Sequence, residues 1–226
     1  MAPAQASLLA KLDTQERVRD FLTNAVASGR ASHAYLFLGA PGAGKLDAAW
    51  ALAQAFLCEQ DGCGACDSCV RVARHTHPDV HYYTPESATG YLIAQTRELL
   101  DDVPLAPIRA KAKVYIIDRA EQLRANTANA LLKTLEEPPD GVMFILLGTS
   151  ADVMLPTIVS RCQCVPFRLV SPAVAAQAAA AASRQGTTRV FIVHHLAVSY
   201  AQMADIRKRT RHRPCLFRLF TYFRWK

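Results

Sequence analysis

Strand candidates of four to six residues alternate along this chain with longer amphipathic stretches. They lie at residues 34–38, 80–83, 114–117, 142–147 and 162–167. Most of them are apolar at every position, which is typical of strands whose sheet is covered on both faces. Because the intervening stretches have helical periodicity, the pattern predicts an α/β fold with a parallel sheet and helices on both faces.

Four stretches show the helical period, at 14–28, 45–57, 93–102 and 119–136. In the first of them, Asp13 is a candidate N-cap and Gly29 is a candidate stop. The alanine-rich second stretch follows a glycine-rich turn, so the sequence predicts a strand, a loop and a helix there. Pro138 and Pro139 end the last stretch and turn the chain toward the next strand.

Length and composition fit a globular protein. The 226 residues suffice for one large or two small domains, and 51% of them are hydrophobic against 20% charged. No apolar run approaches the roughly 20 residues that span a bilayer, and the N-terminus lacks a basic segment followed by an apolar one. We therefore expect a cytoplasmic address and no membrane partner.

The positive charge is concentrated at the end of the chain. The formal net charge is +7, yet residues 184–226 hold ten Lys and Arg against one acidic residue, Asp205. The preceding part is nearly neutral, so the overall charge does not argue that a folded domain binds DNA. Basic tracts are common and no recognition fold accompanies this one. We therefore interpret 186–226 as a poorly ordered extension rather than as a DNA-binding arm.

A glycine-rich segment matches most of a phosphate-binding loop. Residues 39–46 read GAPGAGKL and fit the pattern G-x-x-x-x-G-K, between a predicted strand and a predicted helix. In such loops backbone N–H groups wrap the phosphates and the lysine contacts the terminal ones. The residues assigned to these contacts are Gly39, Gly42, Gly44 and Lys45. Leu46 replaces the Ser or Thr that holds Mg²⁺, so nucleotide docking stays open while hydrolysis should be poor.

The acidic pair that hydrolysis needs is incomplete. One carboxylate of such a pair holds Mg²⁺ and the next activates water. Asp118 follows the predicted strand and fits the first role, but its neighbour Arg119 cannot act as a base. Glu121 lies three residues beyond Asp118, where we expect a solvated glutamate at a helix start. Two independent parts of a hydrolytic site are therefore missing.

Four of the seven cysteines lie within twelve residues, namely Cys58, Cys63, Cys66 and Cys69. In a cytosolic chain this spacing indicates metal ligands rather than disulfides. Four thiolates close a tetrahedral Zn²⁺ site with no open position, so we predict a structural zinc module at 58–69. His75, His77 and His81 follow closely, but four sulfurs suffice, and surface or turn positions account for the histidines.

Two longer stretches make the chain similar to a known family. Residues 129–139 read NALLKTLEEPP and residues 155–162 read LPTIVSRC, and both closely resemble the clamp-loader subunits of bacterial DNA polymerase III, which are AAA+ proteins. The stretches 32–37 and 77–79 and the cysteine cluster match as well, so the resemblance covers about residues 14–168. It implies a P-loop sheet with a zinc module after the P-loop helix, a small helical lid and a C-terminal collar domain.

The resemblance defines the expected domains. An AAA+ P-loop domain is expected at 1–168, followed by the start of the helical lid at 169–185, which includes an alanine-rich helix at 173–183. The composition changes after Pro172, and no collar domain is recognised beyond it. The basic tail at 186–226 is a departure from the family.

The resemblance also implies a role for Arg161. It places there an arginine finger, a side chain that neutralises charge on the phosphoryl group transferred in a neighbouring subunit. Without the Ser-Arg-Cys match at 160–162, Arg161 would be interpreted as a cap on the C-terminal carbonyls of the preceding helix. The match favours the finger.

Three functions compete. The first is a non-motor, stator subunit of a clamp loader, because Leu46 and Arg119 differ from the intact loop and Asp-Glu pair of the motor (gamma/tau) type. Its implied partners are gamma/tau and delta subunits, the sliding clamp, and primer-template DNA through the complex. The alternative is an active ATPase, a motor-type subunit or another AAA+ protein, in which Glu121 and bound water repair the site. A small zinc-containing DNA-binding protein is disfavoured by the near-neutral body.

Overall fold

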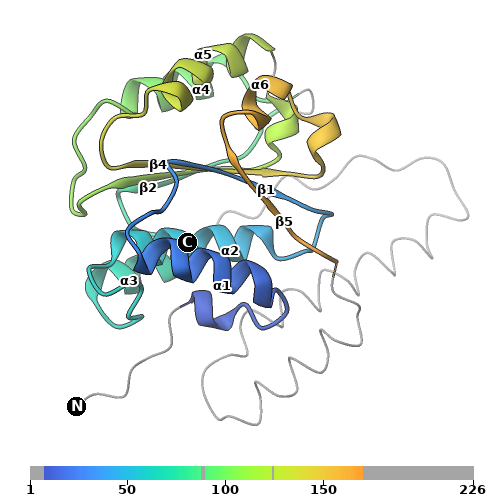
Figure 1. Cartoon of the computed structure of the whole chain (residues 1–226). Coiled ribbons are helices and arrows are strands. Elements are labelled where there is room, and N and C mark those ends of the chain that lie inside the picture. The colour runs from blue at the N-terminus through green and yellow to red at the C-terminus, as the bar shows by residue number, and fades with distance from the viewer. Residues whose placement is uncertain (1–7, 88–89, 124, 170–226) are drawn as a thin grey trace, which may run out of the picture. The chain divides into compact units, whose positions relative to one another are not determined.

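The described part of the chain folds around a five-stranded parallel sheet. The computed structural model describes residues 8–87, 90–123 and 125–169. The strands are β1 (Ala34–Leu38), β2 (Val80–Tyr83), β3 (Lys113–Ile117), β4 (Val142–Gly148) and β5 (Gln163–Pro166). Their spatial order is β2-β3-β4-β1-β5 and every pairing is parallel, which confirms the predicted sheet (Figure 1).

Some of the sequence predictions fall outside the described residues. The start of the helical lid at 169–185 does so apart from Leu169, and the tail at 186–226 does so entirely. Within the described part of the chain, no helix is long and apolar enough to cross a membrane.

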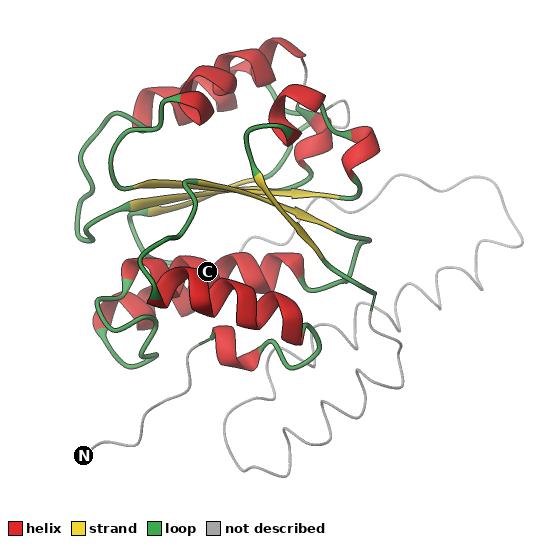
Figure 2. Ribbon diagram, viewed as in Figure 1, coloured by secondary structure: helices red, strands yellow, loops and turns green. Residues whose placement is uncertain are grey.

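Two helical layers cover the sheet (Figures 1 and 2). One face carries α1 (Glu16–Ala27), α2 (Lys45–Leu57) and α3 (Asp67–Ala73), and the other carries α4 (Ile93–Asp102), α5 (Ala125–Glu136) and α6 (Pro156–Val159). Short 3-10 turns are η1 (Leu9–Lys11), η2 (Ala120–Gln122) and η3 (Ala151–Val153). Successive β1 side chains enter opposite cores, since Phe37 shares a core with Leu52 of α2 and Leu36 with Leu131 of α5.

Helix α1 ends as predicted but begins differently. Gly29 has the left-handed conformation, with φ of +65°, that ends many helices. The residue before the helix is Gln15 and not Asp13, so the predicted N-cap is wrong. Gln15 is buried, and its side-chain amide donates to the carbonyls of Ala43 at 3.1 Å and Arg168 at 2.6 Å. The start of α1 is therefore fixed by contacts with distant parts of the chain.

The stretch 119–136 forms two elements instead of the single predicted helix. Arg119 has φ of +46°, a left-handed conformation that is unfavourable for a non-glycine residue by about 1–2 kcal/mol. Its Nη2 donates to Thr84 Oγ1 at 2.8 Å. After η2 the backbone of Leu123 is extended, and α5 begins at Ala125. The prediction of one continuous helix is wrong because the extended backbone of Leu123 separates η2 from α5.

Asp79 anchors the loop that leads into β3. It is fully buried directly before β2, and its carboxylate accepts N–H bonds from Ile108, Arg109 and Ala110 at 2.5 to 2.8 Å. Burial alone would raise the pKa of Asp79, but the three backbone N–H groups outweigh it and hold the pKa below its ordinary value. The anion is therefore the form that stabilises the fold.

We expect Asp79→Asn to lower the free energy of unfolding by about 3 kcal/mol, since hydrogen bonds to a charged acceptor contribute roughly 1.5–3 kcal/mol each. Urea denaturation at neutral pH measures the loss. Because the folded-state pKa lies below the ordinary carboxyl value of 3.8, the stabilisation is present above that pH and is lost as the pH falls through the folded-state pKa. The control is Asp101→Asn at an exposed α4 position. Equal midpoints for Asp79→Asn and wild type would contradict the anchor.

Candidate functional site

The glycine-rich loop joins β1 to α2 as the sequence predicts. Gly42 and Gly44 have φ of +81° and +82°, values that residues with side chains rarely adopt. Lys45 is the first residue of α2, and the first N–H groups of a helix have no partner within it. A strand, a glycine loop and a helix N-terminus in this order form an anion-binding arrangement.

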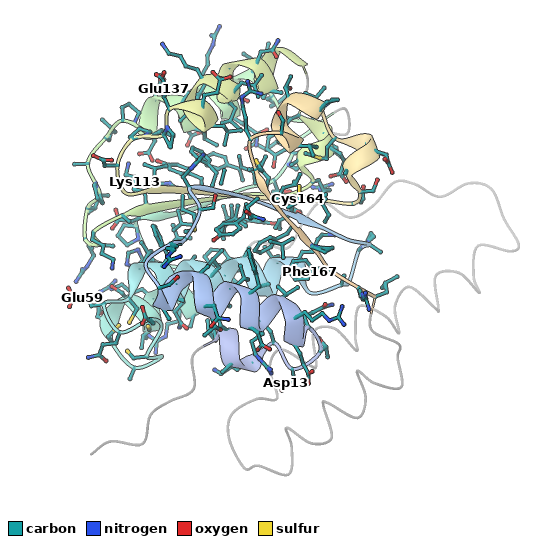
Figure 3. The ribbon with its side chains drawn as sticks, viewed as in Figure 1. Asp13, Glu59, Lys113, Glu137, Cys164 and Phe167 are labelled. Atoms are coloured by element: carbon teal, nitrogen blue, oxygen red, sulfur yellow. The ribbon has the colours of Figure 1, made fainter. Side chains whose placement is uncertain are left out.

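Gly39 is required by packing as well as by its place in the loop. A Cβ atom at this position would lie 2.7 Å from the carbonyl oxygen of Phe167 and 2.9 Å from its Cβ. Phe167, labelled in Figure 3, directly follows β5, and its N–H donates to the carbonyl of Leu38 at 2.6 Å. A larger residue at Gly39 would therefore displace the end of β5 from the loop.

Lys45 is folded back onto its own loop. Its Nζ donates to the carbonyl oxygens of Gly39 and Ala40, the latter at 3.1 Å. Burial lowers the pKa of Lys45, and the carboxylates of Glu121 and Asp118 only partly oppose that shift. The lysine thus lies near two acidic residues, with its ammonium group engaged by loop carbonyls.

Both departures from a hydrolytic site are visible in the structure. Leu46 is exposed in the first turn of α2 and has no oxygen to offer to Mg²⁺. Asp118 directly follows β3, and its Oδ2 accepts a hydrogen bond from the Tyr82 hydroxyl at 3.4 Å. The same oxygen lies 3.7 Å from Nε of Arg119. The carboxylate of Asp118 is therefore engaged within its own chain, and the residue beside it is a cation rather than a base.

Glu121 lies at the start of a helical turn, as the sequence predicts, but its carboxylate is less solvated than expected. It belongs to η2 and is half-buried, and its Oε2 is enclosed with no hydrogen-bond partner among the described residues. Its negative charge raises the pKa of Lys45 and so partly opposes the effect of burial. The expectation of a solvated side chain is wrong, and Glu121 is a second carboxylate whose charge acts on the loop lysine.

The four predicted zinc ligands come together. Their Sγ atoms all lie within 4.8 Å of one another. Sγ of Cys58 is 3.7 Å from those of Cys63 and Cys66, and Sγ of Cys63 is 3.9 Å from that of Cys69. Four sulfurs about 2.3 Å from a tetrahedral Zn²⁺ lie about 3.8 Å apart. The sulfur positions therefore fit a zinc ion.

Local structure favours the thiolate at Cys63, whereas burial raises the pKa of the Cys66 and Cys69 thiols. The backbone N–H groups of Ala65 and Cys66 lower the pKa of the Cys63 thiol to about 6, which favours the thiolate that binds metal. Sγ of Cys66, the residue before α3, accepts the N–H of Cys69 at 3.4 Å. Gln54 of α2 is buried and donates to the carbonyl of Cys69 at 3.0 Å. This hydrogen bond connects the cysteine cluster to the helical layer formed by α1, α2 and α3.

The three histidines that follow the cluster have other contacts. His75 stacks on the tryptophan ring of α2, with ring centroids 4.0 Å apart. His77 is buried rather than at the surface, which corrects the sequence interpretation, and its Nδ1 accepts the N–H of Asp79 at 3.1 Å. Nε2 of His81 lies 3.3 Å from Oδ2 of Asp102. Among the described residues, the group of side chains placed to share a metal consists of the four cysteines.

Arg161 follows α6 and is bonded within its own chain. Its Nε and Nη2 both donate to Oε1 of Glu136, Nε at 2.7 Å. Its Nη1 donates to the carbonyl of Thr157 at 3.0 Å and to Oγ of Ser160 at 3.2 Å. The isolated chain therefore contains a contact between Arg161 and a carbonyl of the preceding helix. That contact is the alternative to the arginine finger that the sequence suggests.

Two residues that contact the candidate sites, Glu136 and Gln15, were not predicted from the sequence. Glu136 ends α5 and is the partner of Arg161, and it lies in the stretch 129–139 that carries the family resemblance. The place of Glu136 in that stretch was the feature of the sequence that could have identified it. Gln15 bonds to the carbonyl of Ala43 in the glycine loop, and no local pattern marks this residue.

Comparison with known proteins identifies the family. The family model described as DNA polymerase III, delta subunit, matches residues 14–171. The chain is 40% identical over 163 residues to the DNA polymerase III subunit delta' of Bacillus subtilis, an alignment that covers 71% of this chain and 49% of that protein. It is 39% identical over 162 residues to the DNA polymerase III subunit gamma/tau of Mycobacterium tuberculosis, covering 70% of this chain and 28% of the relative.

Solved structures share the fold. A DNA polymerase III gamma subunit-related protein from Thermotoga maritima matches with a TM-score of 0.51 and 21% identity, over 70% of this chain and 47% of that one. The PCH-2 protein of C. elegans matches with a TM-score of 0.50 and 17% identity, over 76% and 48%. The chain spans about half the length of the delta' relative and less of the gamma/tau relative. On the family model and these sequence relatives, the chain belongs to the DNA polymerase III delta subunit family, among the clamp-loader subunits of that polymerase.

Proposed function

We propose that this chain is a non-motor, stator subunit of a DNA polymerase III clamp loader. In this role it supports the ATP-dependent loading of a sliding clamp onto primed DNA, while neighbouring subunits hydrolyse the ATP. Its partners are gamma/tau-type and delta subunits, the clamp, and primer-template DNA reached through the complex. Such a role belongs to the bacterial cytoplasm.

The observation that carries this proposal is Leu46 in the first turn of α2. A P-loop needs a hydroxyl there to hold Mg²⁺, and leucine supplies none. Arg119 removes a second requirement, because it puts a cation beside Asp118 where a water-activating carboxylate is needed. The two departures affect different steps of one reaction, which supports a subunit that does not turn over ATP. Asp118 then remains as a degenerate acidic motif.

The remaining sites have supporting roles in this proposal. The loop residues Gly39, Gly42, Gly44 and Lys45 form a degenerate phosphate site. Docking of a nucleotide there requires Lys45 to exchange its loop carbonyls for phosphate oxygens. The cysteine cluster holds a structural zinc, and Arg161 acts as an arginine finger on ATP bound by a neighbouring subunit.

We expect the purified chain alone to hydrolyse ATP no faster than its Lys45→Ala variant. Loss of the Mg²⁺-holding hydroxyl and of the second carboxylate should each lower the rate by roughly 10²-fold or more. Steady-state phosphate release, measured with and without primed DNA and clamp, tests this expectation. Hydrolysis at the rate of a motor subunit, abolished by Lys45→Ala, would overturn the stator assignment.

Glu121 supports a second candidate function, that of a motor-type clamp-loader subunit or another AAA+ ATPase that hydrolyses ATP itself. Its Oε2 is enclosed without a hydrogen-bond partner among the described residues, and its charge acts on Lys45. A carboxylate in this position is able to accept a proton from water near the phosphates. Hydrolysis by the chain alone that is lost in Glu121→Gln would establish this candidate and exclude the stator.

A further inference from the structure

Glu136 fixes both the position and the plane of the Arg161 guanidinium. The side edge of that group, formed by Nε and Nη2, donates to a single oxygen of Glu136, with Nε at 2.7 Å. Charge-assisted contacts of two N–H groups with a carboxylate hold an arginine in a defined orientation more firmly than a point contact does. The orientation of Arg161 is therefore set by a residue 25 positions earlier in the chain.

The position of Glu136 at a helix end gives a reason for its pairing with Arg161. The C-terminal end of a helix carries partial negative charge, so the position of Glu136 at the end of α5 is unfavourable for an unpaired glutamate. Arg161 removes that conflict, and its Nη1 also donates to the carbonyl of Thr157 in α6. The Arg161 cation thus contacts residues near the C-terminal ends of both α5 and α6, which lie side by side.

The bound guanidinium is still accessible from outside. Nη2 gives one hydrogen to Glu136, and its second hydrogen has no acceptor among the described residues. The side chain of Arg161 retains 32% exposure to solvent. The contact with Glu136 therefore leaves part of the Arg161 side chain open to solvent and leaves one N–H of Nη2 without a partner among the described residues.

We propose that Glu136 is a positioning residue that aims Arg161 at the phosphoryl group held by a neighbouring subunit. This inference rests on the proposed role of Arg161 as a finger acting in another subunit. Glu136 does not touch the nucleotide. It acts by holding the guanidinium in one orientation through the contacts of Nε and Nη2 with its carboxylate. The opposite possibility is a latch, in which Glu136 withholds Arg161 from the nucleotide.

The test uses the full chain assembled with gamma/tau-type and delta subunits, clamp and primed DNA. The DNA-stimulated ATPase rate is measured against ATP concentration, and Arg161→Ala defines the part of kcat that depends on the finger. Glu136→Gln is expected to lower that part by about 10- to 100-fold with KM unchanged, because misplacing a catalytic group by about 1 Å costs on the order of 10²-fold. The matched control is Glu137→Gln, at the adjacent exposed glutamate labelled in Figure 3, which should behave as wild type.

Two further readouts separate positioning from a general loss of structure. The double variant Glu136→Gln/Arg161→Ala should be no slower than Arg161→Ala, because both changes remove the same contribution. Thermal unfolding and zinc content of Glu136→Gln should match those of Glu137→Gln. Wild-type or higher kcat in Glu136→Gln would overturn the positioning role and, if higher, establish the latch. If Arg161→Ala itself had no effect, the finger role of the proposed function would fail instead.

Discussion

We expect the wild-type chain to carry one zinc ion and the replacement of Cys63 and Cys66 by serine to abolish zinc binding. The double change removes two of four thiolates whose sulfurs lie within 4.8 Å of one another. Serine hydroxyls do not replace thiolates in structural zinc sites. Structural zinc contributes about 10–16 kcal/mol in zinc-finger peptides near neutral pH, more than any single side-chain contact. The variant should therefore lose the local fold of residues 58–73.

Metal analysis of protein purified without chelator measures the stoichiometry, and thermal unfolding with and without chelator measures the stabilisation. The matched control is Cys164→Ser in β5, a free cysteine far along the chain from the cluster, labelled in Figure 3. It should retain one zinc ion and the unfolding temperature of the wild type. Substoichiometric zinc in well-folded wild-type protein would show that the cluster is not a zinc site.

Loss of the Arg161 guanidinium is expected to have the largest effect on the assembled loader. Arginine fingers contribute about 10³ to 10⁵ in rate in well-studied P-loop enzymes, because they neutralise charge that develops on the phosphoryl group. Arg161→Ala and Arg161→Lys should both lower the DNA-stimulated rate of the site that this chain completes. Lysine should not rescue it, because a point charge does not reproduce the planar fork that Glu136 holds.

Rapid-quench measurement of ATP hydrolysis by the assembled loader, compared between the wild type and the Arg161 variants, gives the contribution of this one site as a difference. Arg17→Ala provides the control, since Arg17 is exposed on α1 and makes no ion pair within the described residues. Both Arg161 variants should stay folded and zinc-loaded, because a single exposed ion pair contributes only about 0–1 kcal/mol to stability. Wild-type hydrolysis and clamp loading by either variant would show that Arg161 is structural.

The parallel sheet was predictable because its strands are short and apolar. Every residue of β3 and β4 is buried, and burial on both faces is what produces a continuous apolar run. The clustering of the four cysteines was equally predictable from their spacing, and their sulfurs lie within 4.8 Å of one another. The break before α5 was not, since the extended backbone of Leu123 lies within a stretch of helical period and no proline or glycine marks it.

The contacts around the candidate sites were the least predictable part. Gln15 reaches Arg168 across 153 positions of sequence, and Glu136 reaches Arg161 across 25. Such distant pairs cannot be recognised from the periodicity of a single sequence. They form because of how the layers pack, and local propensity does not determine them. Glu121 was misjudged for the same reason, since a 3-10 turn replaced the predicted helix start and buried its carboxylate near Lys45.

The most direct test of the stator role adds this chain, as wild type or as Lys45→Ala, to gamma/tau-type and delta subunits with clamp and primed DNA. The DNA-stimulated ATPase rate is measured in each mixture and without the chain. Both forms are predicted to raise the rate equally, because the chain completes a neighbouring site and its own loop performs no hydrolysis. A rise with the wild type alone, or no rise with either form, would contradict the proposed role.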